Sequence, residues 1–257
     1  MGIRPLYDPH HGQMRVAVFS SGWLGTFRAA LDAAADNAAA MKVVLLVSDR
    51  LGTACSELAR RKGMPVIERD FAAELGKLEG AARSEASDRM HDEMLGEIKD
   101  FEQEHGAIDL VVLTYNRIIR GAMFSHFRDC MINQHPADLT AVDDQGARRY
   151  TGFDGLARSI RDGVAATRTS TILVTEGVDE GEILGQGPWV PVNRSKGYVD
   201  VKVHELLQEQ QSDWPILTTI LQLICVGRLG LDDGDILPGC RQVYLDEQPL
   251  PCGGVQI

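Results

Sequence analysis

Residues 14–22 read MRVAVFSSG, an apolar run that ends in three small residues. Two similar runs occur later, VVLLV at residues 43–47 and LVVL at residues 110–113. Strands without an alternation of polar and apolar side chains are buried on both faces, which is typical of parallel sheets. We therefore expect residues 14–19, 43–47 and 110–113 to be adjacent parallel strands of one sheet.

Helical patterns separate these strands, so the sequence predicts an α/β fold with a doubly wound, mostly parallel sheet. The expected helices of the first half cover residues 24–35, 53–61 and 85–105, with a short strand at residues 65–67.

The C-terminal half has a different pattern, because two strand-like segments lie close together. They cover residues 169–174 and 182–191, on either side of an acidic turn at residues 175–181. This spacing predicts an antiparallel hairpin. Other elements are expected at residues 130–132 (strand), 155–162, 201–210 and 216–226 (helices, the last two broken near Pro215) and 242–250 (a hairpin that turns at Asp246 and Glu247).

We expect residues 1–257 to form a single domain, because no segment has the composition of a flexible linker. Its expected parts are a short flexible N-terminal arm (1–13), a nucleotide-fold-like half (14–115), a catalytic half (116–229) and a C-terminal tail hairpin (230–257). The two halves are expected to share one sheet.

Composition excludes several classes of protein. The formal net charge of −11 disfavours nucleic acid as a partner. No apolar run reaches the length of a membrane span, and the N-terminal residues do not resemble a signal peptide. The five cysteines are odd in number and lack CxxC spacing, which argues against a disulfide framework and a zinc site. We expect a cytoplasmic protein without a metal or a membrane partner, and the oligomeric state stays open.

Ligands of open parallel sheets bind at the carboxyl ends of the strands, and two loops there are candidates. Residues 20–26, SSGWLGT, could present free backbone N–H groups to an anion. The loop lacks the GxGxxG pattern and a P-loop lysine, so an ordinary strand-to-helix turn is the alternative.

The second loop contains Asn133 and His135, followed by Pro136. Alternate residues of an extended chain project to one side, so the amide and the imidazole would lie together. Such a pair can stabilise an oxyanion and move a proton, although a surface histidine at a strand end is the alternative. Asp179 in the acidic turn could orient the ring and raise its pKa towards neutrality, unless the turn is only a solvated hairpin tip.

The combination of Asn133-Gln134-His135-Pro136 with residues 178–184, VDEGEIL, resembles the folate-dependent formyltransferase family. The segments RVAVFSSG (15–22), DLVVLTYNRII (109–119) and TSTILVTEGVDEGEIL (169–184) match in the same order, and the resemblance spans about residues 14–229. In the order of its motifs and in its short length, the chain is most similar to the branch of the family that acts on glycinamide ribonucleotide. The resemblance implies a formyltransferase-like fold and a place in purine biosynthesis.

The resemblance also implies an activity, the transfer of a formyl group from 10-formyltetrahydrofolate to a small amine. Asn133 would bind the formyl oxygen, His135 would assist proton transfer, and Asp179 would hold His135 and a water molecule. The implied folate-binding residues are Arg117, Ile119, Thr175, Glu176, Gly177 and Val178. Ser21 and Gly22 would lie at the substrate end.

Departures from the family pattern leave the acceptor open. Leu24 occupies a position in the first loop where the family has a small residue, and the late Glu-His pair is replaced by Gln210-Gln211, or by Glu209 in a shifted register. Arg148 and Arg149 could hold an anionic acceptor or the folate glutamate tail, or they are surface arginines. A hydrolase that uses water as the acceptor, and a folate-binding protein without turnover, are the alternative functions.

Overall fold

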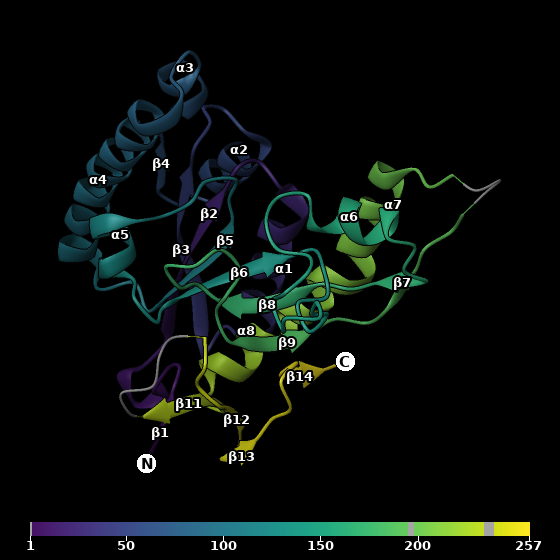
Figure 1. Cartoon of the computed structure of the whole chain (residues 1–257). Helices are drawn as coiled ribbons and strands as arrows, with labels where there is room; N and C mark the ends of the chain where they lie inside the picture. Colours follow the sequence, from purple (N-terminus) through teal and green to yellow (C-terminus); the bar gives the residue numbers. More distant parts are fainter. Residues whose placement is uncertain (1, 195–197, 234–238) are drawn as a thin grey trace.

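The computed structural model describes residues 2–194, 198–233 and 239–257. Its largest sheet has eight strands in the order β14-β9-β8-β6-β5-β2-β3-β4 (Figure 1). The strands are β2 (Met14–Ser20), β3 (Met41–Ser48), β4 (Val66–Glu68), β5 (Leu110–Thr114), β6 (Met131–His135), β8 (Ser170–Leu173), β9 (Ile183–Gln186) and β14 (Val255–Gln256).

The centre of this sheet confirms the predicted arrangement, because β2 pairs in parallel with both β3 and β5. Along β2, Val16 and Val18 belong to one hydrophobic cluster, whereas Ala17 and Phe19 belong to another. Successive side chains of a strand point to opposite faces, so the apolar run supplies both cores.

Helices cover both faces of the sheet. The cluster that contains Val16 also contains residues of α1 (Leu24–Asp36), α2 (Ala54–Arg61) and α8 (Trp214–Cys225). The opposite cluster contains residues of α3 (Phe71–Leu75), α4 (Gly80–His105) and α5 (Gly121–His126). Within the described ranges, no helix has the length and apolar character needed to cross a membrane.

The antiparallel hairpin is also confirmed, since β8 pairs antiparallel with β9 and with β6. Residues 182–191 do not form one strand, however. They are divided between β9 and β10 (Val190–Pro191), which pairs with β7 (Ala166–Thr167) in a separate two-stranded sheet. The predicted strand at residues 130–132 extends to His135, so Asn133 lies within the sheet.

The N-terminal segment is not the flexible arm that we predicted. β1 (Gly2–Pro5) pairs antiparallel with β11 (Leu229–Asp233), in a sheet completed by β12 (Val243–Leu245) and β13 (Gln248–Pro249). The short helix η1 (Pro9–His11) follows β1. The C-terminal hairpin is confirmed: Asp246 and Glu247 have φ of 51° and 64°, the left-handed conformations that a tight two-residue turn requires.

The predicted break near Pro215 is wrong. α7 (Val201–Gln208) continues through η2 (Glu209–Asp213), a π-helical segment, into α8. The N–H of Trp214 donates to the carbonyl of Glu209, five residues earlier, and Pro215 lies in the first turn of α8. The missing N–H of a proline is tolerated in a first turn, so the chain stays helical. The remaining helix, α6 (Gly155–Arg161), agrees with the prediction.

Candidate active site

A cleft of about 530 Å³ lies at the carboxyl ends of β5 and β6, and the turn of the β8–β9 hairpin also lines it. Its walls come from residues 113–119, 133–136 and 172–179, together with side chains from α1 and from the α7–η2 helix. Open α/β sheets bind ligands at this edge. The cleft is therefore the candidate active site.

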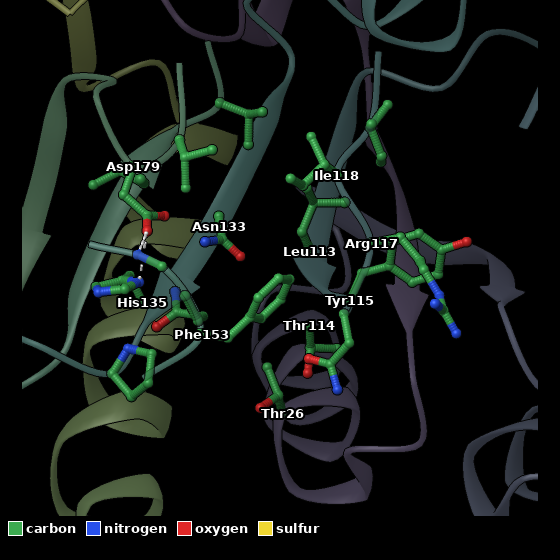
Figure 2. A pocket seen from close by; sticks show the side chains of 18 of the residues that line it. Thr26, Leu113, Thr114, Tyr115, Arg117, Ile118, Asn133, His135, Phe153 and Asp179 are labelled. Atoms are coloured by element: carbon green, nitrogen blue, oxygen red, sulfur yellow. Dashed lines mark hydrogen bonds and ion pairs between the residues drawn. The ribbon is translucent and has the colours of Figure 1, made fainter. Parts of the chain in front are cut away.

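Asn133, His135 and Asp179 all line this cleft (Figure 2). His135 Nδ1 lies 3.2 Å from Asp179 Oδ2, while the intervening Gln134 donates from Nε2 to Thr171 Oγ1 at 2.8 Å. Among the described residues, the Asn133 amide has no hydrogen-bond partner. It is therefore free to bind a ligand.

The backbone around Asp179 explains how a residue of the turn reaches His135. Asp179 has a φ of 56°, a left-handed conformation that aspartate adopts more readily than most residues. The N–H of Gly152 donates to Asp179 Oδ2 at 2.7 Å. Arg148 donates from its guanidinium to the carbonyls of Asp179 and Gly181. Arg148 therefore holds the turn and is not among the residues that line the cleft, so its role in binding an acceptor or the folate tail stays a prediction.

The protons of the His135–Asp179 pair follow from their partners. His135 Nε2 lies 2.6 Å from the carbonyl oxygen of Tyr150, and since a carbonyl only accepts, Nε2 is the donor. The contact between His135 Nδ1 and Asp179 Oδ2 is attractive only when a second proton lies between these two atoms. A proton that the pair takes up would therefore bind between Nδ1 and Oδ2, so the pair can accept and release one proton.

The pKa of His135 contradicts the upward shift that we expected. The ring is only 4% exposed, and burial lowers its pKa below the ordinary value. The charge of Asp179 and the hydrogen bond to Tyr150 oppose this shift without reversing it. Desolvation of the imidazolium therefore outweighs its attraction to one carboxylate.

The residues predicted to bind folate come from the loop after β5 and from the turn of the β8–β9 hairpin. Arg117, Ile119 and residues 175–178 all line it. Arg117 donates from Nε to Asp49 Oδ2 at 2.6 Å and lies over the ring of Phe71. Asp49 is fully buried, so it fixes the position of the arginine.

The residues predicted at the substrate end are placed differently. Ser21 is buried and its Oγ accepts from Asn116 N at 2.8 Å, and Gly22 N donates to Ser20 Oγ. The same loop contributes Trp23 and Thr26 to the cleft instead. Leu24 packs against the core cluster beneath α1.

Arg149 lies on the surface and outside the cleft. Its guanidinium pairs with Asp162 at 2.8 Å and lies over the ring of Tyr150. It lines a second hollow that also includes Trp189. Neither arginine of this loop lines the cleft, although Arg148 contacts the backbone of Asp179.

The sequence model of the family described as formyl transferase matches residues 14–211. The chain belongs to the formyl transferase family. The chloroplastic phosphoribosylglycinamide formyltransferase of Arabidopsis thaliana is 28% identical over 173 residues, which is 67% of this chain and 53% of that protein. The chain thus spans about half the length of this curated relative.

Solved structures agree with this assignment. Glycinamide ribonucleotide transformylase 1 from Symbiobacterium toebii is 26% identical, with a TM-score of 0.68 over 91% of this chain and 94% of that one. A formyltetrahydrofolate deformylase from Pseudomonas syringae is 15% identical, with a TM-score of 0.66 over 91% of this chain and 66% of that one. The second likeness shows the fold alone.

Three carboxylates of the cleft were not predicted as site residues, and of these the sequence pointed only to Glu209, in a shifted register. Glu205, Glu209 and Asp213 line the cleft from α7 and η2. Their spacing of four residues, which puts helical side chains on one face, was the available signal. Asp49 was also missed, although it directly follows an apolar strand.

The described residues contain no group of three His, Cys, Asp or Glu side chains arranged to hold a metal ion.

The three carboxylates repel one another. Burial, followed by the charges of Asp213 and Glu205, raises the pKa of Glu209 to about 7. Burial and the charge of Glu205 raise the pKa of Asp213 to about 6, against a lowering hydrogen bond from Thr169. Carboxylates with raised pKa values are common at functional sites.

Replacing Asp179 with asparagine should lower the pKa of His135 further. The carboxylate charge raises this pKa, so its removal leaves burial less opposed. A pH titration of the imidazole nitrogens by NMR, in wild type and Asp179→Asn, measures the difference. An unchanged or higher pKa in the variant would contradict the pairing.

The Glu209→Gln variant should unfold at a higher temperature than the wild type at pH 8. A folded-state pKa raised to about 7 means that ionised Glu209 destabilises the fold above that pH. Glu209 is partly solvated, so we expect a gain of at most ~1 kcal/mol, or roughly 2–4 °C. The gain should shrink as the pH falls below 7, because wild-type Glu209 is then protonated.

Calorimetry at pH 8 and pH 5 measures this gain. Glu85→Gln, a matched change at an exposed position of α4, should leave the unfolding temperature within a degree or so of wild type. Equal shifts in both variants would show that the effect is only the change in net charge.

Proposed function

We propose that this chain transfers a formyl group from 10-formyltetrahydrofolate to a small amine. The observation that carries the proposal is the meeting of an unengaged amide, Asn133, with the proton-sharing pair His135–Asp179 in one cleft. Acyl transfer needs a donor for the developing oxyanion and a group that moves a proton. Asn133 and His135, near the carboxyl end of β6, and Asp179, in the hairpin turn, supply these two groups.

Each residue has a defined role in this reaction. As the amine nitrogen attacks the formyl carbon, the Asn133 amide donates to the formyl oxygen, which gains negative charge. The His135–Asp179 pair takes the proton that the amine loses. The bond between the formyl carbon and folate N10 breaks, and the pair returns a proton to N10. The products are tetrahydrofolate and an N-formyl amine.

A second part of the cleft wall supports folate as the donor. Ile118, Ile119 and Val178 give it an apolar lining, which suits the faces of a pterin ring. The backbone of residues 175–178 offers polar groups to the edge of the ring. Arg117, held by Asp49 at 2.6 Å, is a suitable partner for a carboxylate of the folate tail. The free cysteines support a reducing, cytoplasmic location.

The relatives are named for phosphoribosylglycinamide, an acceptor that carries a phosphate. Neither arginine of the loop before α6 is placed to bind that phosphate, because Arg148 holds the hairpin turn and Arg149 pairs with Asp162. We therefore propose that this compound is a poor acceptor here. Formyl transfer as a reaction does not depend on that choice.

The His135→Ala variant should lower turnover by at least ~10²-fold and leave folate affinity nearly unchanged. Groups that move protons act mainly in the transition state, so their loss lowers kcat more than it weakens binding. Release of tetrahydrofolate measures turnover, and titration with the folate measures affinity. His10→Ala, an exposed histidine in η1, is the matched control and should behave as wild type.

The same assay separates the alternative functions when it is run with and without an amine. Formyl transfer requires that tetrahydrofolate release depend on the amine. Equal release in water alone would show a hydrolase, and tight folate binding without release would show a binding protein. An equal loss of folate affinity and rate in His135→Ala would make His135 a binding residue.

A further inference from the structure

The wall of the cleft formed by α7 and η2 is strongly anionic. Among the described residues that line the cleft, the acidic ones are Glu205, Glu209 and Asp213 on this wall and Glu176 and Asp179 in the hairpin turn, where Glu176 pairs with Arg128 at 3.6 Å. Arg117 is the one arginine in this set, and Asp49 already pairs with it at 2.6 Å. Among the described residues, Glu205, Glu209 and Asp213 have no cationic partner, so a ligand that brings a negative charge to this wall would be repelled.

Asp213 is built into the site by a buried network. It is 8% exposed, and Thr169 Oγ1 donates to its Oδ1. Gln208 Nε2 in turn donates to Thr169 Oγ1 at 3.0 Å, and Thr169 N donates to Ser212 Oγ at 3.0 Å. Within the part of the chain that the structure describes, no group donates to the second oxygen, Oδ2. A buried carboxylate with an unused oxygen on a cleft wall is a strong acceptor for a cationic donor.

Two exposed aromatic side chains line the same cleft. Phe153 is 76% exposed, which is unusual for a large apolar side chain, and Figure 2 shows its ring directed into the cleft. Trp23 lies at the start of α1 and is also exposed. The face of an aromatic ring attracts cations through its quadrupole. Aromatic faces and carboxylates thus favour the same kind of ligand by independent interactions.

We propose that the acceptor is an amine with a second cationic group, such as a linear diamine or polyamine. Its reacting nitrogen lies beside Asn133 and His135, and its distal cation binds between the aromatic rings and the carboxylates of Glu205, Glu209 and Asp213. This inference rests on the proposed formyl transfer and names the class of its acceptor.

Matched amines test this inference by the rate of tetrahydrofolate release. The set is 1,4-diaminobutane, n-butylamine and 4-aminobutyl phosphate, which differ only in the distal group. We expect kcat/KM for the diamine to exceed that for butylamine at least about tenfold, the scale of one hydrogen bond to a charged group. The phosphate should be the poorest. A phosphate equal to or better than the diamine would overturn the inference and leave formyl transfer intact.

The variants Glu209→Gln and Asp213→Asn test whether these two carboxylates cause the preference for the diamine. Both keep the size of the side chain, and an asparagine at 213 can still accept the bond from Thr169. Each should reduce the ratio of kcat/KM for the diamine to kcat/KM for butylamine, measured in the same variant, at least about threefold. Glu85→Gln is the control and should keep the full advantage. An unchanged advantage in both cleft variants would show that these carboxylates do not bind the distal cation.

A binding measurement distinguishes failure of the inference from failure of the proposed function. Calorimetric titration of the protein saturated with tetrahydrofolate, first with 1,4-diaminobutane and then with 4-aminobutyl phosphate, needs no turnover. Preference for the diamine would support the anionic acceptor site even if no amine were formylated, in which case only the proposed reaction fails. Preference for the phosphate, or equal binding of both, would overturn the inference.

Discussion

The contact between His135 Nδ1 and Asp179 Oδ2 is the interaction on which the site depends. It joins the end of β6 to the turn of the β8–β9 hairpin. Because β6 and β8 pair antiparallel, β8 ends opposite Ile132, and the turn has to fold back along β6 to bring Asp179 to His135. The left-handed conformation of Asp179 and the hydrogen bond from Gly152 aim the carboxylate at the ring. Tyr150 fixes the other nitrogen and with it the position of the protons.

The second constraint is the repulsion between the carboxylates of the α7–η2 helix. Glu209 and Asp213 have raised pKa values because the fold buries them near each other and near Glu205. Such an arrangement costs stability and is retained where a ligand can relieve it. The π-helical segment, residues 209–213, keeps two of these carboxylates on one wall of the cleft, in keeping with the frequent use of π-bulges at functional sites.

The central sheet and the hairpin could be predicted because local patterns decide them. An uninterrupted apolar run specifies a strand buried on both faces, and two short strands around an acidic turn specify a hairpin. Pairings between distant segments left no such pattern. β1 joins β11 from the opposite end of the chain, and β14 has only two residues. The sequence shows the residues of these segments, but it does not show which strand each segment pairs with.

The site was predictable only in part for a related reason. Asn133, His135 and Asp179 form a motif with fixed spacing, and the structure brings them into one cleft. The position of Arg148 depends on two backbone carbonyls that only the folded hairpin turn presents. The pKa of His135 depends on burial, which a sequence does not show. Asp49 was missed because its partner, Arg117, lies on another loop.

The fate of the formyl carbon tests the central claim most directly. The protein would be incubated with 10-formyltetrahydrofolate labelled with ¹³C in the formyl group, together with excess amine, and the products followed by NMR. The account predicts that the label appears in an N-formyl amine in the same amount as the tetrahydrofolate released, and that this signal is lost in Asp179→Asn. Label found only as formate, or an unchanged signal in the variant, would contradict it.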